Sequence, residues 1–314
     1  MKRLLIVVTF TLAALYGCNR AADQRDRPRI ALVLKTLNNP FFIEMQKGAD
    51  DAARKSGVDL IVQAAEREVD VEKQMQIIEN LIESKVAALC VTPSGSKEIV
   101  AAIVKANRAH IPVVVVDTRV DAAALKDAAG TVSTFIGSDN FEGGRLAGEF
   151  MAKALGGHGE VAILEGIPGH ETGDSRLRGF HEAIKKEPGL KVVASQTANW
   201  ERDQGFNVFQ NILQSHPAIR GLFACSDLMA LGAVEAIAAA KKTGKIAVIG
   251  FDAFDEARDA VRRGTMVATI AQSPATMGTL AVENAVRLIH GESVPETIPV
   301  DIKLITNESE PGRK

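Results

Sequence analysis

Short apolar runs alternate with longer amphipathic stretches along most of the chain. Residues 30–34 form a continuous aliphatic run, and residues 41–56 behind it carry apolar side chains at helical spacing. The same order repeats and is interrupted once, by a bridging stretch after the apolar run 113–116. The predicted strands are residues 30–34, 58–64, 87–91, 113–116, 160–164, 192–195, 221–224, 246–251 and 267–271. The predicted helices are residues 41–56, 71–84, 99–110, 176–186, 204–215, 229–241, 254–263 and 277–290.

This pattern predicts an α/β protein with two lobes. Strands that are apolar throughout and are joined by helices are typical of parallel sheets covered on both faces. Two such series indicate two doubly wound parallel-sheet lobes, and 314 residues is about twice a typical domain. Ligands of such folds bind beyond the carboxyl ends of the strands. We therefore expect the binding chemistry in the polar residues that follow each run.

Polar and aromatic side chains follow most of these runs. They are Asn39, Phe41, Phe42, Thr92, Asp117, His170, Arg176, Trp200, Ser226, Asp252 and Gln272. A carboxylate accepts two hydroxyl protons, Arg and Asn donate to hydroxyl oxygens, and aromatic rings cover the apolar C–H faces of a sugar. The set therefore favours a neutral polyhydroxylated ligand, because an anion would require additional Arg or Lys.

Several of these residues also have a structural alternative. Phe41 and Phe42 would suit a hydrophobic staple at a helix start, and Asp117 and Asp252 would suit helix caps. Arg176 would suit an ion pair on its own helix. The two carboxylates are also a candidate acid/base pair. The sequence contains neither G-x-S-x-G nor a phosphate-binding loop, so we expect binding without catalysis.

Composition and charge exclude further classes of protein. The chain is 46% apolar and 24% charged, with a net charge of −2, which is typical of a globular protein. Nucleic acid is not predicted as a partner, since there is neither a basic surplus nor a dense basic stripe. No C-x-x-C or H-x₃-H spacing and no cofactor motif occurs, so we expect neither metal nor cofactor. Cys90 and Cys225 lie inside apolar runs and are expected to pack in the core.

The N-terminus has the features of an export signal. The apolar run 4–15 follows Lys2 and Arg3 and is too short to span a bilayer. Its end, Leu-Tyr-Gly-Cys at 15–18, resembles the lipobox of bacterial lipoproteins. Residues 1–17 are therefore expected to be a lipoprotein-type signal peptide, Cys18 the acylated residue and residues 18–28 a tether. An ordinary cleaved signal is the alternative.

Motifs along the chain carry a family resemblance. They are TLNNPFF at 36–42, GSDN at 137–140, GG at 143–144, MALGA at 229–233, VIGFD at 248–252, ATIAQ at 268–272 and PVD at 299–301. Together they resemble the periplasmic pentose- and hexose-binding proteins, most of all the ribose-binding branch. The similarity runs in register over about residues 29–305.

The resemblance implies a fold, a site and partners. The fold is the type I periplasmic binding protein fold, with residues 29–138 plus 273–301 in one lobe and 139–272 plus 302–314 in the other. A three-crossover hinge joins them, with Asp139 and Asn140 as hinge residues. The resemblance implies hydroxyl binding by Asn39, Asp117, Arg176, Asp252 and Gln272, and stacking on Phe41, Phe42 and Trp200. The protein would be a periplasmic or surface monomer that passes a monosaccharide to an ABC permease.

The chain departs from the ribose pattern at several places. Thr118 separates Asp117 from Arg119, and Thr92 and Ser226 each replace an asparagine. Residues 168–170 are more similar to the glucose/galactose-binding branch. These changes shorten donors, so a related pentose, hexose or sugar alcohol is as good a candidate as ribose.

Two other functions are compatible with this fold. One is a sugar-sensing receptor that signals to a chemoreceptor or a sensor kinase. The other is the effector domain of a LacI-like repressor. The export signal and the lack of an N-terminal helix-turn-helix in this sequence argue against the repressor.

Overall fold

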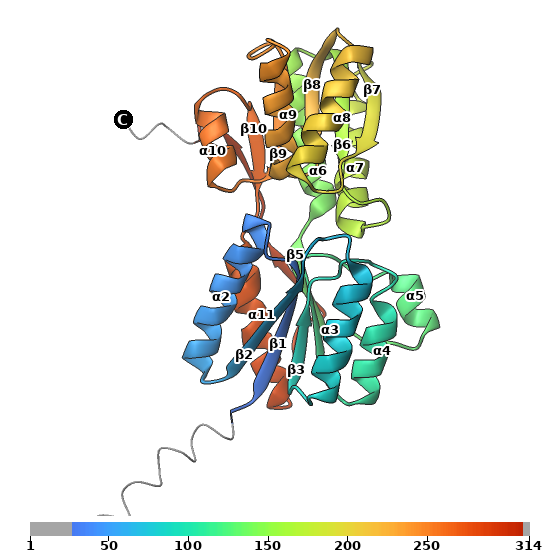
Figure 1. Cartoon of the computed structure of the whole chain (residues 1–314), viewed down its shortest axis with the longest axis vertical. Coiled ribbons are helices and arrows are strands. Elements are labelled where there is room, and N and C mark those ends of the chain that lie inside the picture. The colour runs from blue at the N-terminus through green and yellow to red at the C-terminus, as the bar shows by residue number, and fades with distance from the viewer. Residues whose placement is uncertain (1–26, 310–314) are drawn as a thin grey trace, which may run out of the picture.

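The apolar runs of the sequence form the strands of two six-stranded sheets, one in each of two lobes (Figure 1). The computed structural model describes residues 27–309. The predicted signal peptide, Cys18, most of the predicted tether and residues 310–314 lie outside this range. The lobes are stacked along the long axis of the molecule (Figure 1).

The first lobe is built from the N-terminal part of the described chain and a segment close to its C-terminal end. Its strands are β1 (Arg29–Thr36), β2 (Asp59–Ala65), β3 (Ala88–Val91), β4 (Val113–Val116), β5 (Thr134–Ser138) and β11 (Thr297–Val300). Its helices are α2 (Pro40–Ser56), α3 (Val71–Glu83), α4 (Val100–Arg108), α5 (Ala122–Asp127) and α11 (Pro274–Ile289). The strand order is β11-β5-β4-β3-β1-β2, and all neighbours are parallel.

The second lobe repeats this arrangement. Its strands are β6 (His158–Glu165), β7 (Gly189–Thr197), β8 (Ile219–Ala224), β9 (Ala247–Asp252), β10 (Ala268–Ala271) and β12 (Lys303–Thr306). Its helices are α6 (Asn140–Leu155), α7 (Glu171–Ile184), α8 (Arg202–Ser215), α9 (Asp227–Ala239) and α10 (Asp255–Arg262). The strand order is β12-β10-β9-β8-β6-β7.

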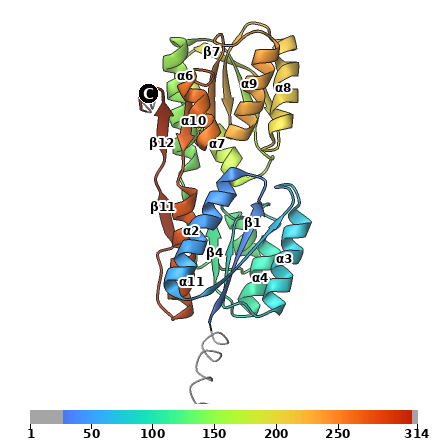
Figure 2. The same ribbon diagram turned by 60° about the vertical axis from the view of Figure 1, so that its left-hand side comes forward.

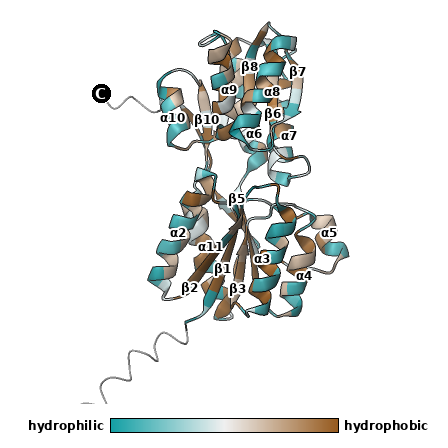
Figure 3. Ribbon diagram, viewed as in Figure 1, coloured by the Kyte–Doolittle hydropathy of each residue, from teal (hydrophilic) through white to brown (hydrophobic). Residues whose placement is uncertain are grey.

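Strand β1 shows why these runs are apolar at every position. Ile30, Leu32 and Leu34 pack in one cluster with α2 and α11, whereas Ala31 and Val33 pack in another with α3 and α4. Successive side chains of a strand point to opposite faces of the sheet. Both faces are covered by helices, so no position remains for a polar residue. Figure 3 shows the result as hydrophobic strands enclosed by helices with hydrophilic outer sides.

The chain crosses between the lobes at the β5–α6, β10–α11 and β11–β12 connections (Figure 2). The predicted fold class, two doubly wound lobes on a three-crossover hinge, is therefore confirmed. The predicted lobe boundaries fall in these three connections, and we keep them as a proposal. Beyond the second crossing, α11 returns to the first lobe and packs on α2.

Two glycines allow α11 to lie close to α2. A Cβ on Gly48 would be 1.9 Å from the carbonyl oxygen of Ala275, and one on Gly278 would be 1.9 Å from that of Met45. Real side chains essentially never approach so closely, so alanine at either position would push the helices apart. The contact fixes the returning segment on the first lobe.

The structure corrects the sequence prediction at several elements. Strand β12 is antiparallel to β10, because the chain leaves the first sheet at its cleft end and enters the second sheet from the cleft. The bridging stretch contains α5, β5 and α6, which were not predicted. Helix α7 begins at Glu171 rather than at 176, since its first turn is Glu-Thr-Gly-Asp and carries no apolar spacing that would mark a helix.

Both cysteines of the described range are buried, as the sequence predicts. Burial raises the pKa of the Cys90 and Cys225 thiols to about 12, so both stay protonated and unreactive at neutral pH. Between residues 27 and 309, no helix is both long and apolar enough to cross a bilayer.

Candidate functional site

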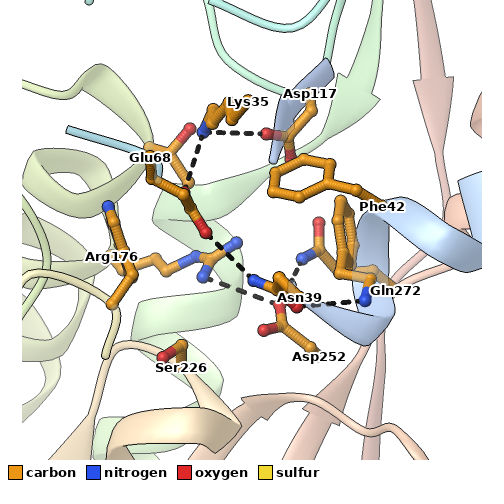
Figure 4. Close-up of a pocket in the computed structure, with 12 residues that line it drawn as sticks. Lys35, Asn39, Phe42, Glu68, Asp117, Arg176, Ser226, Asp252 and Gln272 are labelled. Atoms are coloured by element: carbon orange, nitrogen blue, oxygen red, sulfur yellow. Dashed lines mark hydrogen bonds and ion pairs between the residues drawn. The ribbon is translucent and has the colours of Figure 1, made fainter. Parts of the chain in front are cut away.

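A cavity lies between the lobes, at the carboxyl ends of their strands (Figure 4). Both lobes contribute to its wall. The lining residues are Lys35, Asn39, Phe41, Phe42, Glu68, Asp117, Thr172, Arg176, Trp200, Ser226, Asp252 and Gln272. Most of these side chains are buried, so the cavity wall is screened from bulk solvent.

Contacts between the lobes close this cavity. The Arg67 guanidinium of the first lobe binds Glu201 Oε1 of the second lobe at 2.7 Å. The backbone N–H of Glu171 donates to Ser96 Oγ across the cleft at 3.3 Å. The conformation is therefore a closed one, in which a ligand would be screened from bulk water.

The start of α2 positions the first group of site residues. Asn39 is the N-cap, and its side-chain oxygen accepts from the Phe41 N–H at 3.0 Å while its Nδ2 donates to Glu68 Oε1 at 3.0 Å. Pro40 occupies the first helical position, where a missing N–H costs nothing. The rings of Phe41 and Phe42 meet edge to face, 5.3 Å between centroids. Local capping chemistry thus places one amide and two rings on the cavity wall.

Asp117 lies directly after β4 in a strained turn. Its φ is +66°, and the N–H of the next residue, Thr118, donates to the Val116 carbonyl at 2.7 Å. Such three-residue turns with positive φ are rare for residues other than glycine. Asp117 Oδ2 binds Lys35 Nζ at 3.2 Å and accepts from Thr118 Oγ1 at 3.0 Å. In the described part of the chain both partners bind Oδ2, so Oδ1 remains available for a ligand hydroxyl.

Lys35 and Glu68 belong to the site and were not predicted from the sequence. Lys35 is only 2% exposed, and its Nζ lies 3.2 Å from Asp117 and 3.9 Å from Glu68. Burial raises the pKa of the Glu68 carboxyl, and the Lys35 charge partly offsets this. A lysine at the end of an otherwise apolar strand was the available signal. Glu68 lies in a polar loop and gave none.

Arg176 is the central donor of the second lobe. It is 3% exposed, and its Nε donates to Asn140 Oδ1 at 2.9 Å while its Nη1 donates to the Cys225 carbonyl at 2.6 Å. Its guanidinium lies 3.6 Å from the centroid of the Phe251 ring. The own-helix ion pair considered from the sequence is not among these contacts. Arg176 instead joins α6, α7 and the ends of two strands.

Asp252 ends β9 with a φ of +113° and faces Arg176 across the cavity floor. Its Oδ1 accepts from Gln272 Nε2 at 2.9 Å and lies 3.8 Å from Arg176 Nη1. Burial raises the pKa of Asp252 to about 7, although Arg176 and Gln272 lower it. Gln272 Oε1 is buried and has no hydrogen-bond partner within residues 27–309. An unpaired buried acceptor beside the cavity indicates a place for a ligand hydroxyl.

Ser226 both caps a helix and lines the cavity. Its hydroxyl oxygen caps α9 by accepting from the Met229 N–H at 3.4 Å, and the residue also lines the cavity. The next residue, Asp227, is the first of the helix and accepts from Thr269 Oγ1 at 2.7 Å. It lies outside the set of residues that line the cavity.

Trp200 forms one wall of the cavity through a backbone with φ of +67°. Its ring fills the space beside Gly166 and Gly173, where a Cβ would lie 1.9 Å and 3.2 Å from it. Its Nε1 lies 3.5 Å from His170 Nδ1. Burial lowers the pKa of His170 to about 4, so the imidazole is neutral and accepts from the indole.

The structure brings most of the predicted site together. Nine of the predicted residues line the cavity: Asn39, Phe41, Phe42, Asp117, Arg176, Trp200, Ser226, Asp252 and Gln272. Thr92 does not, because its buried hydroxyl bonds the Val33 carbonyl within the sheet. His170 does not line the cavity either, and its ring contacts the Trp200 indole. Their direct contact with ligand is therefore not supported by the geometry.

Arg119 and metal ligands are also absent from the cavity wall. Arg119 is turned outward by Thr118 and lies 3.8 Å from the centroid of the Phe135 ring. Among residues 27–309, no group of three or more His, Cys, Asp and Glu side chains is arranged to hold a metal ion. The cavity instead presents alternating donors and acceptors beside aromatic rings, which is a surface for a neutral polyol.

Comparisons with known proteins agree with this chemistry. A family model described as a periplasmic binding protein domain matches residues 30–293. The ribose import binding protein of Bacillus subtilis is 37% identical over 98% of this chain and 99% of its own length. The D-allose-binding periplasmic protein of Escherichia coli is 38% identical over 86% of each chain.

Solved structures show the same relationship. An ABC transporter periplasmic solute binding protein from Actinobacillus succinogenes, determined with bound D-allose, is 42% identical with a TM-score of 0.86. The match covers 90% of this chain and 99% of that one. The resemblance found in the sequence motifs is thus confirmed. The chain belongs to the periplasmic binding protein family and is similar to the ribose-type sugar-binding proteins of ABC importers.

Proposed function

We propose that this protein captures a monosaccharide between its lobes and delivers it to an ABC importer. The observation that carries the proposal is the buried cavity between the lobes. It joins Asp117 of one lobe with Arg176 and Asp252 of the other, and aromatic rings flank these polar groups. The named relatives are binding proteins for ribose and D-allose. This supports capture without catalysis.

D-allose and D-ribose are the first sugars to test. A thermal-shift screen should include both, with D-arabinose, D-glucose and myo-inositol as competitors of the same chemical class. A ligand at 100 times its Kd stabilises the folded protein by about 2.7 kcal/mol, which is a clear shift in melting temperature. Isothermal titration would then give the affinity of each hit. A screen in which no monosaccharide or sugar alcohol shifts the melting temperature would contradict the proposal.

Trp200 offers an independent optical test, because it is the single tryptophan of the sequence. We expect its emission to change saturably with the cognate sugar and to stay constant with non-binders, since ligand and lobe closure alter its surroundings. Trp200→Phe should retain most of the affinity. Trp200→Ala should lose roughly 1–3 kcal/mol of binding, in proportion to the apolar area uncovered. Full affinity in Trp200→Ala would place the sugar elsewhere.

Location and partners follow from the family. Membership implies export to the periplasm, and we propose in addition that Cys18 carries the lipid anchor, as the lipobox-like residues 15–18 suggest. An intact-mass spectrum of the mature protein would show the diacylglyceryl group. We further propose that the protein acts as a monomer and that its closed form is recognised by a permease. A chemoreceptor or sensor kinase is the second candidate partner.

A further inference from the structure

Two threonine hydroxyls meet across the cleft at the edge of the ligand cavity, whose wall includes Thr172. Thr118 follows β4 in the first lobe, and Thr172 lies in the first turn of α7 in the second lobe. Their Oγ1 atoms are 2.9 Å apart, and the residues are 0% and 3% exposed. A buried hydrogen bond therefore links the lobes, although 54 residues separate its two ends in the sequence.

The direction of this bond follows from the proton count. A hydroxyl carries one proton, and Thr118 Oγ1 donates its proton to Asp117 Oδ2 at 3.0 Å. Thr118 must then accept from Thr172. The hydrogen bonds thus run from Thr172 through Thr118 to the carboxylate of Asp117.

This series of hydrogen bonds ends at the Asp117 carboxylate, whose position depends on contacts with other residues. Asp117 sits in a turn with φ of +66°, a conformation that surrounding contacts must hold in place. Lys35 and Thr118 both bind its Oδ2. The orientation of the carboxylate, and hence of the Oδ1 that faces a ligand, depends on these two partners.

We infer that Thr118 and Thr172 are positioning residues that couple lobe closure to the orientation of Asp117. The inference rests on the proposed function, since it assigns both residues to the sugar site. When the lobes close, Thr172 donates to Thr118, and the Thr118 proton is thereby committed to Asp117. When the lobes open, the bond from Thr172 is lost, and water can replace Asp117 as the acceptor of the Thr118 hydroxyl. The carboxylate is then best aligned for a sugar hydroxyl in the closed state.

The experiment uses valine variants of the full chain, because valine has nearly the shape of threonine without the hydroxyl. Thr118→Val, Thr172→Val and the double variant would be compared by isothermal titration and by stopped-flow sugar dissociation. We expect an affinity loss of about 3- to 10-fold for Thr172→Val and about 10-fold or more for Thr118→Val. The losses should appear chiefly as faster dissociation, because the bond forms only in the closed state.

Three comparisons separate positioning from a general structural effect. The double variant should lose less than the product of the two single losses, because both substitutions break the same bond. Thr118→Ser and Thr172→Ser should restore most of the affinity. Thr134→Val is the matched control, since Thr134 is equally buried in the first lobe and its hydroxyl has no hydrogen-bond partner within residues 27–309. It should bind sugar like the wild type.

The outcomes distinguish this inference from the proposed function. Wild-type affinity in both valine variants, with affinity lost in Asp117→Ala, would overturn the inference and leave the function standing. The inference would also be overturned if Thr172→Val lowered the melting temperature of the ligand-free protein along with the affinity. Independent effects of the two substitutions in the double variant would overturn it as well. If the wild-type protein binds no sugar, the proposed function fails and the inference fails with it.

Discussion

Replacing Asp252 or Asp117 by alanine is expected to weaken sugar binding by about 2–5 kcal/mol each, which is roughly 30- to 5,000-fold in Kd. Each carboxylate is buried in the cavity wall and positioned to accept hydroxyl protons, and charge-assisted hydrogen bonds are strong there. Alanine also removes the counter-charge of a buried cation, which is Arg176 in the case of Asp252 and Lys35 in the case of Asp117. Isothermal titration with the best sugar of the screen measures the loss. Affinity close to the wild type in both variants would exclude this cavity as the binding site.

The Asp252 carboxyl also predicts how affinity depends on pH. Burial raises its pKa to about 7, and only the ionised form accepts two hydroxyl protons. Affinity should therefore decrease as the pH falls from 8 to 5. The stability of the folded protein should depend on pH in the opposite sense. Because the pKa of Asp252 is raised on folding, this group stabilises the folded state below about pH 4, and its contribution is lost as the pH rises through about 7. Asp252→Asn should flatten both profiles, and an unchanged pH profile of binding in this variant would assign the effect to another group.

Replacing Arg176 by methionine is expected to destabilise the second lobe by about 3–5 kcal/mol, because it removes one partner of a buried charge pair. The side chain holds Asn140, the Cys225 carbonyl and the face of the Phe251 ring. Its loss leaves the Asp252 carboxyl buried without its cation. Sugar affinity should fall below detection in the same variant, since a donor disappears from the cavity wall.

Denaturant unfolding of the ligand-free protein measures the stability change, and isothermal titration measures the binding. Arg178→Met is the control on the same helix, because the Arg178 side chain is exposed and does not line the cavity. It should change stability by less than about 0.5 kcal/mol, as most surface substitutions do. Arg176→Lys should not restore binding, because an ammonium group cannot reproduce the planar fork of the guanidinium. A stable Arg176→Met protein with wild-type affinity would contradict this role.

The sequence alone predicts most of the fold, because its main signal is local. Residues 30–34 are apolar at every position since both faces of a parallel sheet are covered. That property specifies a doubly wound lobe without any knowledge of the other lobe. The strands it missed, β5, β11 and β12, are short, and β11 and β12 lie on sheet edges. Their pairing depends on where the chain crosses between the lobes, which no local pattern encodes.

The site divides in the same way. Asn39, Asp117, Arg176 and Asp252 could be named from the sequence because a polar residue after a parallel strand must lie at the ligand-binding edge of the sheet. The residues found only in the structure are those whose role depends on a distant partner. The buried charge of Lys35 at the end of an apolar strand is compensated by two carboxylates, Glu68 from the loop after β2 and Asp117 from the end of β4.

The contact between Thr118 and Thr172 is the clearest case. In the sequence, Thr118 is an interruption between Asp117 and Arg119, and Thr172 lies four residues before the predicted start of its helix. Closure of the lobes brings their hydroxyls to hydrogen-bonding distance. The sequence by itself thus determined two lobes and the polar edge of each. Only the tertiary structure decided which side chains meet between them, because those contacts depend on long-range packing and burial and leave no periodic pattern along the chain.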